Sequence, residues 1–139
     1  MDKGGAKKIL LIEDDPQQIM IYETEFNNYG YKIMVADNGM KGIEIAKREL
    51  PDLIFLDMIL GDIEGMQVLR KLKAEPKTKD LKVVVLSNLN KKELADEAAA
   101  LGAIDYLVKI QYLPREIVEQ AKKYLAGETT AHGGDNEVI

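Results

Sequence analysis

The chain of 139 residues lacks cysteine altogether, and its only histidine is His132. Without cysteine there is no disulfide, no thiolate metal site and no thiol nucleophile, which excludes thiol redox chemistry and suits a reducing cytosol. Long apolar runs are missing too, since nothing approaches the roughly 20 apolar residues of a membrane-spanning helix, and the short polar start is not a signal peptide. We therefore expect a soluble, cytoplasmic protein that does not enter a membrane.

An excess of positive charge is also absent. The net charge is -5 and the isoelectric point is near 5.0, which is the wrong sign for a module that grips phosphate backbones, so direct nucleic-acid binding is disfavoured. A chain of this length that is 46% hydrophobic can bury one core. We expect a flexible N-terminus over residues 1–7, one domain over residues 8–126, and a disordered polar tail over residues 127–139.

Short apolar runs alternate with segments that carry helix signals, which is the pattern of a parallel sheet covered by helices on both faces. Asp15 can cap the first helix with Pro16 at its first position, Gly30 can end it, and Asn90 with Glu93 forms a capping box for the fourth helix. The expected strands are residues 9–12, 31–36, 53–56, 83–86 and 106–108. The expected helices are residues 16–29, 40–49, 65–74, 91–101 and 114–126.

Four of the expected strands end on residues suited to phosphate chemistry. The first runs into Glu13 and Asp14, the third into Asp57, the fourth into Ser87 and the fifth into Lys109. Because open α/β sheets bind ligands outside the carboxyl ends of their strands, these groups should gather in one crevice. Several carboxylates without Cys or His favour Mg²⁺ or Mn²⁺, and Lys109 is a natural counter-ion for Asp57, which follows the most buried strand.

These residues fall into motifs that resemble the receiver domain of two-component response regulators, here in stand-alone form. The motifs are Ile-Glu-Asp-Asp-Pro at 12–16, Leu-Asp-Met-Ile-Leu-Gly-Asp-Ile-Glu-Gly at 56–65, Leu-Ser-Asn at 86–88 and Asp-Tyr-Leu-Val-Lys at 105–109. The resemblance covers Lys8 to about Ala126. It implies a flavodoxin-like, doubly wound (βα)₅ three-layer sandwich with strand order 2-1-3-4-5.

The resemblance also assigns roles to the site residues. It implies that Asp57 accepts the phosphoryl group and that Glu13, Asp14, Asp57 and the main-chain carbonyl of Ile59 hold Mg²⁺. It further implies that Ser87 and Lys109 contact the phosphoryl group and that Ser87 and Tyr106 form the switch. Such a protein catalyses only its own phosphorylation and dephosphorylation and is not otherwise an enzyme.

The resemblance implies partners as well. Because His132 lies in the expected tail, the phosphohistidine should come from a sensor histidine kinase or a phosphotransfer protein. A downstream protein target would read the switched surface, and a homodimer that forms on phosphorylation is a further expectation.

The chain departs from the receiver pattern at three positions. Gly61 stands where proline is common, Ile110 stands where most members have a proline in a cis peptide, and Asn88 replaces a small residue. A cis bond before Ile would cost about 2.5–4 kcal/mol, so we expect the loop after Lys109 to take another path.

Three other functions can be compared with the receiver motifs. A haloacid-dehalogenase-like phosphatase would need a second Asp where Ile59 stands, and a flavin-binding flavodoxin would need a hydroxyl- and glycine-rich loop where the acidic cluster stands. The stronger alternative is a receiver-like protein-interaction module that acts without phosphorylation, which Ile110 and Asn88 make worth testing.

Overall fold

The computed structural model describes residues 6–128 of the chain. Residues 1–5 of the predicted flexible start (1–7) and residues 129–139 of the predicted disordered tail (127–139), which holds His132, lie outside this range. The elements are β1 (Lys8–Ile12), α1 (Pro16–Asn28), β2 (Lys32–Ala36), α2 (Gly39–Glu49), β3 (Leu53–Leu56), α3 (Gly65–Ala74), β4 (Val83–Ser87), α4 (Lys92–Leu101), β5 (Asp105–Val108), a short 3₁₀ helix η2 (Lys109–Gln111) and α5 (Pro114–Leu125).

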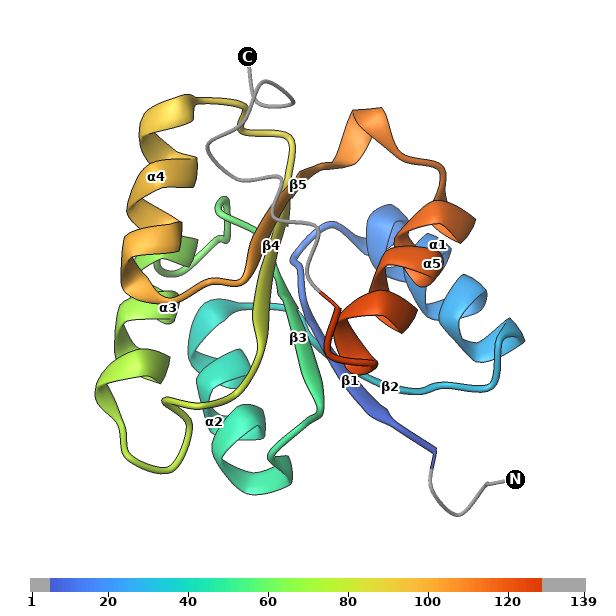
Figure 1. The fold of residues 1–139 in the computed structure, drawn as a ribbon, viewed down its shortest axis with the longest axis horizontal. Coiled ribbons are helices and arrows are strands. Elements are labelled where there is room, and N and C mark those ends of the chain that lie inside the picture. The colour runs from blue at the N-terminus through green and yellow to red at the C-terminus, as the bar shows by residue number, and fades with distance from the viewer. Residues whose placement is uncertain (1–5, 129–139) are drawn as a thin grey trace.

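The five strands form one parallel sheet in the order β2-β1-β3-β4-β5. Helices α1 and α5 cover one face of the sheet, and α2, α3 and α4 cover the other (Figure 1). This arrangement confirms the predicted three-layer sandwich and its strand order. Within the described residues no helix has both the length and the apolar character needed to cross a bilayer.

The core consists of two apolar layers, one on each face of the sheet. Alternate residues of β1 point to opposite faces, so Leu10 and Ile12 pack toward α2, α3 and α4, whereas Ile9 and Leu11 pack toward α1 and α5. All four residues of β3 are buried, as expected for a central strand covered on both sides. Central β3 therefore delivers Asp57 to the middle of the carboxyl edge.

Several details of the helices differ from the expectations. Asp15 does cap α1, accepting a hydrogen bond of 2.9 Å from the Gln17 N–H. The predicted Asn90 capping box is wrong, because α4 begins at Lys92 and Lys91 holds the N-cap position without a side-chain cap. Asn90 lies one residue too early, since β4 extends through Ser87 and the loop after it is displaced by one residue along the chain.

Helical spacing in the sequence predicts Ile19 on the buried face of the first helix and Leu125 on that of the last, and both faces shift slightly in the structure. Ile19 of α1 is only partly buried, and in α5 Tyr124 is buried where the helical spacing had placed Leu125. Leu125 still packs at the margin of the same core layer. The helix therefore turns its aromatic residue inward, and Tyr124 becomes available to a buried carboxylate described below.

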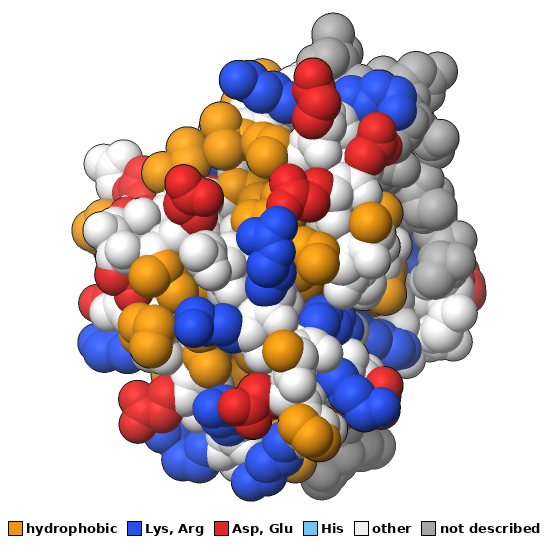
Figure 2. All heavy atoms as spheres, turned by 90° about the vertical axis from the view of Figure 1, so that its left-hand side faces the viewer, with side chains coloured by type: hydrophobic (Ala, Val, Ile, Leu, Met, Phe, Trp, Pro, Cys, Tyr) orange, Lys and Arg blue, Asp and Glu red, His pale blue; other side chains and the backbone are white. Residues whose placement is uncertain are grey.

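The outer face formed by α2, α3 and α4 carries charges of both signs among apolar patches (Figure 2). Ion pairs join neighbouring helices across it: Lys47 lies 3.2 Å from Glu75, and Arg70 pairs with Glu97. Positive side chains are thus interleaved with negative ones on this face rather than gathered into a basic stripe.

Candidate phosphoacceptor site

A cavity of about 250 Å³ opens at the carboxyl edge of the sheet. It lies where strands β1, β3, β4 and β5 end, so residues that are far apart in the chain share its wall. The lining residues are Glu13, Asp14, Asp15, Gln18, Asp57, Ile59, Ser87, Asn88 and Lys109. The structure therefore brings together every predicted site residue except Tyr106, which lies next to the cavity on β5.

Lys109 links the two most buried carboxylates of the site. Its Nζ donates a hydrogen bond of 2.8 Å to Oδ2 of Asp57 and another to Oε1 of Glu13. Lys109 is 8% exposed, Asp57 is 6% exposed and Glu13 is 1% exposed. One ammonium thus compensates two carboxylates that would otherwise repel each other in a poorly solvated place.

The burial of this cluster shifts the protonation equilibria of two of its members. Burial raises the pKa of the Glu13 carboxyl above its ordinary value of 4.5, and the nearby Asp57 charge adds to the rise while Lys109 opposes it. Burial alone would lower the pKa of Lys109, but its hydrogen bonds to Asp57 and Glu13 outweigh that effect and raise it. Lys109 therefore stays positively charged at neutral pH.

Backbone groups also contact Asp57, one at its carboxylate and one at its main-chain carbonyl. The N–H of Ile59 donates to Oδ1 of Asp57 over 3.1 Å, so both carboxylate oxygens have partners. Behind it, Gly65 begins α3 against the same strand end, and its N–H donates 2.9 Å to the Met58 carbonyl. A Cβ at Gly65 would lie 2.1 Å from the Asp57 carbonyl oxygen, so only glycine fits this contact.

Ser87 and Tyr106 meet through the backbone of Leu89. Oγ of Ser87 accepts a 3.2 Å hydrogen bond from the Leu89 N–H, and the Tyr106 hydroxyl donates to the Leu89 carbonyl oxygen. Tyr106 is 1% exposed, and burial, with a smaller contribution from the Asp57 charge, raises its pKa to about 12. The loop after β4 is therefore held at Leu89 by both predicted switch residues.

Asp14 lies apart from the buried cluster. It is exposed, and its Oδ2 faces Gly61, where an added Cβ would meet it at 3.7 Å. Within residues 6–128 no three Asp, Glu or His side chains lie close enough to hold a metal by themselves. The donor chemistry nevertheless fits Mg²⁺ or Mn²⁺, because carboxylates line the cavity without histidine or a sulfur-containing residue, and the Lys109 ammonium has no lone pair with which to bind a metal.

The two departures at Asn88 and Ile110 prove to be in contact. The Ile110 N–H donates to Oδ1 of Asn88 over 3.0 Å, and no peptide bond in the described residues is cis. The backbone forms the short 3₁₀ helix η2 after β5, which is the different path expected from the missing proline. Lys109 nevertheless reaches both Asp57 and Glu13.

Sequence reasoning missed one buried polar pair outside the cavity. Asp105 begins β5 at the edge of the sheet opposite the cavity, is buried, and accepts a hydrogen bond from the hydroxyl of Tyr124. The one hint in the sequence was an aromatic residue, Tyr124, directly before Leu125. The apolar spacing of the helix did not distinguish these two positions.

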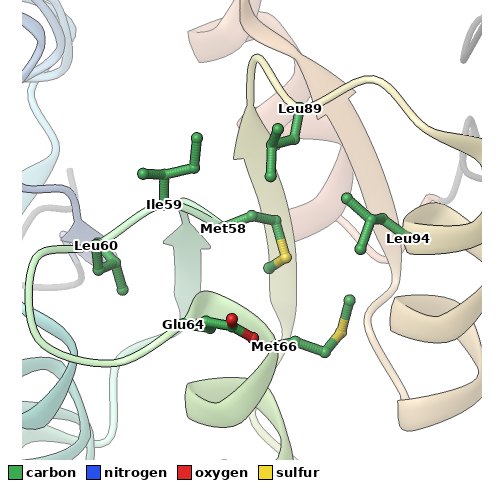
Figure 3. Close-up of a pocket in the computed structure, with 7 residues that line it drawn as sticks. All are labelled: Met58, Ile59, Leu60, Glu64, Met66, Leu89 and Leu94. Carbon is green, nitrogen blue, oxygen red and sulfur yellow. The ribbon is translucent and has the colours of Figure 1, made fainter.

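An apolar pocket lies beside the acidic cavity (Figure 3). Its volume is about 330 Å³, and it lies between the loop after β3, the loop after β4 and the start of α4. The lining residues are Met58, Ile59, Leu60, Glu64, Met66, Leu89 and Leu94. Ile59 also lines the acidic cavity, so the border between the two is apolar.

The fold and this cavity define the class of protein. The family model of the response regulator receiver domain matches residues 9–122, and the chain belongs to this family. Among curated relatives, sporulation initiation phosphotransferase F of Bacillus subtilis is 29% identical over 119 residues, which cover 86% of this chain and 94% of that protein. Other relatives are longer, and the chain spans only 52% and 57% of two of them.

Solved structures show the same fold. A CheY-like receiver domain protein from Methanospirillum hungatei superposes with a TM-score of 0.82 at 24% identity, covering 88% of this chain and 96% of that one. The receiver domain of the Pseudomonas aeruginosa sensor histidine kinase PA1611 gives 0.78 at 21% identity, with coverage of 88% and 99%. That structure has a magnesium ion coordinated in its active-site cleft.

Proposed function

We propose that this receiver domain is a phosphoacceptor, in which Asp57 takes a phosphoryl group from the phosphohistidine of a sensor histidine kinase or a phosphotransfer protein. The observation that carries the proposal is the Asp57 carboxylate at the centre of the sheet edge, held at 2.8 Å by the Lys109 ammonium in an open cavity. A carboxylate with a fixed cation beside it can accept a phosphoryl group and offset the charge that arrives.

In the proposed transfer, an Asp57 oxygen forms a bond to phosphorus as the bond from phosphorus to the histidine nitrogen breaks. The bonding electron pair leaves with the histidine. Phosphoryl transfer needs mainly positioning and charge stabilisation. The Lys109 ammonium supplies charge at Asp57, and the Ser87 hydroxyl lies on the same cavity wall, where it can donate to a phosphoryl oxygen.

We propose that Glu13, Asp14, Asp57 and the main-chain carbonyl of Ile59 would hold Mg²⁺ or Mn²⁺ in this step. The bound ion would offset the negative charge of the carboxylates and of the incoming phosphoryl oxygens. Since Lys109 already holds Glu13 and Asp57, the cation and the ammonium must share these two carboxylates. The magnesium in the cleft of the PA1611 receiver supports the same use of the site here.

The contacts of Leu89 suggest how phosphorylation would be read. If the Ser87 hydroxyl turns toward the phosphoryl group, it gives up the Leu89 N–H, while Tyr106 still holds the Leu89 carbonyl. The loop after β4 and the adjoining α4 would then move together. The changed surface would bind a downstream protein or a second phosphorylated copy of the chain.

Incubation with acetyl phosphate and Mg²⁺, followed by intact-mass measurement, tests the proposal. The wild-type chain should gain the mass of one phosphoryl group, and Asp57→Asn should not. Asp37→Asn is the matched control, because Asp37 follows edge strand β2, is exposed and pairs with Lys41 outside the cavity; it should keep the gain. Chelation of divalent cations should abolish the gain in the wild type and in Asp37→Asn.

The same experiment also tests the alternative, in which the chain is an interaction module that acts without phosphorylation. If the wild-type chain gains no mass under conditions in which a known receiver does, the chain acts as an interaction module without phosphorylation. If Asp57→Asn gains as much mass as the wild type, the acceptor is another residue.

A further inference from the structure

The loop after β4 and the turn after β5 are joined by a side chain that the receiver pattern does not predict. β4 and β5 pair as far as Ser87 and Val108. Just past this last pair, Asn88 accepts the Ile110 N–H at 3.0 Å. The bond continues the connection between the two strands beyond the end of the sheet.

This bond lies next to Lys109, the residue whose ammonium holds Asp57. On one side Lys109 follows Val108, which is paired in the sheet, and on the other it precedes Ile110, which Asn88 holds. The Ile110 side chain is 81% exposed, so packing there does little to fix the turn. A single turn of 3₁₀ helix is also weak by itself, and the Asn88 bond therefore adds a restraint at Ile110 to the one that Tyr112 provides by packing against the core and donating to the Lys109 carbonyl over 3.1 Å.

The restraint matters most during the reaction. At rest the Lys109 ammonium is anchored by its own contacts with Glu13 and Asp57. When a phosphoryl group and a divalent cation engage the oxygens of these carboxylates, those anchors weaken. The position of the ammonium then depends on where the Lys109 backbone is held.

We propose that Asn88 is a positioning residue for phosphoryl transfer: by accepting the Ile110 N–H, it keeps the Lys109 ammonium within reach of Asp57 while the carboxylates take up their new partners. The inference rests on the proposed function and deepens it. Asn88 also lines the cavity, so its side chain could act only as a lid over Asp57. A test has to separate these two roles.

Hydrogen exchange of the Ile110 amide tests the contact without any phosphorylation. Replacing Asn88 by Ala removes the acceptor and should speed exchange at Ile110 by about 2- to 12-fold, the range of one ordinary hydrogen bond. Asn88→Asp keeps an oxygen at the same position and should retain the protection. A residue that serves only as a lid would leave Ile110 exchange unchanged in all variants.

Rates of phosphorylation by acetyl phosphate and Mg²⁺ then test positioning. Asn88→Ala should slow the reaction by about 2- to 12-fold. Ile110→Pro removes the N–H donor and also restricts the backbone of Lys109, the residue before it. Ile110→Ala, which keeps the donor, should have a rate closer to the wild type than Ile110→Pro has.

The double variant Asn88→Ala with Ile110→Pro completes a cycle that isolates the pair, even if proline disturbs Lys109 directly. The double variant should lose less than the product of the two single losses, because the same bond is broken in each. Independent effects would overturn positioning and leave a lid. Unchanged Ile110 exchange in Asn88→Ala would overturn the contact itself. If the wild-type chain accepts no phosphoryl group, the proposed function and the positioning role fail together, while the exchange result still decides whether Asn88 holds the turn.

Discussion

Replacing Lys109 by Met tests whether one ammonium stabilises the acidic centre of the fold. Methionine has nearly the same length and fills the same space, so the change removes the charge and leaves most of the packing. Glu13 and Asp57 then face each other without a cation, and both are almost fully buried. The variant should be markedly less stable than the wild type in the absence of divalent cations.

The size of the loss follows from the burial of the three groups. Removing one partner of a buried ion pair costs about 3–5 kcal/mol, because the remaining charge is left uncompensated. With a urea m-value of about 2 kcal/mol per M, the unfolding midpoint should fall by about 1.5–2.5 M. The measurement is equilibrium urea unfolding at neutral pH with a chelator present.

The matched control is Lys92→Met. Lys92 also pairs with a carboxylate, Asp96, at 2.8 Å, but its side chain is 62% exposed. An exposed pair of this spacing contributes about 0.3–0.5 kcal/mol, so the control should hardly shift the midpoint. If Lys109→Met loses no more stability than Lys92→Met, the reasoning about the buried cluster is refuted.

The loss should also depend on pH with a definite sign. The pKa of Glu13 in the folded protein lies above 4.5, so its protonated form is favoured by folding, and stability falls as pH rises through that folded pKa. Without Lys109, which lowers this pKa, the fall in stability should be larger and should extend to higher pH. The deficit of Lys109→Met should therefore shrink as pH falls toward about 4.5, and a deficit that grows on acidification would contradict the assignment.

Three further outcomes follow from other contacts. Ile59→Asn and Leu89→Glu should each speed loss of the phosphoryl group, measured by the decay of the mass gain, because Ile59 in the cavity wall and Leu89 in the adjoining pocket would gain polar groups that can hold an attacking water; an unchanged decay rate would count against this. Burial raises the pKa of Tyr106 to about 12, so Tyr106→Phe should remove a transition near that pH from the curve of absorbance against alkaline pH. The free energy of unfolding should fall by about 1 kcal/mol, because the hydrogen bond to the Leu89 carbonyl is lost. Tyr124→Phe leaves the Asp105 carboxylate without that hydroxyl and should lower stability by about 1–3 kcal/mol in urea unfolding.

Much of the fold was readable because its signals are local and repeated. Apolar runs such as 53–56 marked buried strands, and Asp15 with Pro16 marked the start of α1. The Asn90 cap failed because the same residue types that cap helices also occupy loops, and only the tertiary path of the loop after β4 decides where α4 begins. Tyr124 was missed because helical spacing alone does not rank neighbouring positions at the margin of a buried face.

The site was predictable in composition but not in connectivity. The ends of parallel strands must meet at one edge, so Glu13, Asp57 and Lys109 could be placed together without coordinates. That Lys109 holds both carboxylates, and that Asn88 holds Ile110, depends on side-chain directions that strand order does not fix. Asn88 and Ile110 depart from the receiver pattern at positions far apart in the sequence, and nothing in the sequence links them. In the structure a hydrogen bond joins them.

The contact between Gly65 and the backbone of Asp57 makes the α3 side of the cavity different from the α4 side. The first turn of α3 rests on the peptide group of Asp57 with no room for even a methyl group, so the two cannot move closer together. Across the cavity, the segment leading into α4 is tethered by hydrogen bonds at Asn88 and Leu89. A movement of the Asp57 backbone toward α3 would therefore meet a steric contact, whereas on the α4 side it would meet only hydrogen bonds, so under the proposed function a signal from Asp57 would pass toward α4.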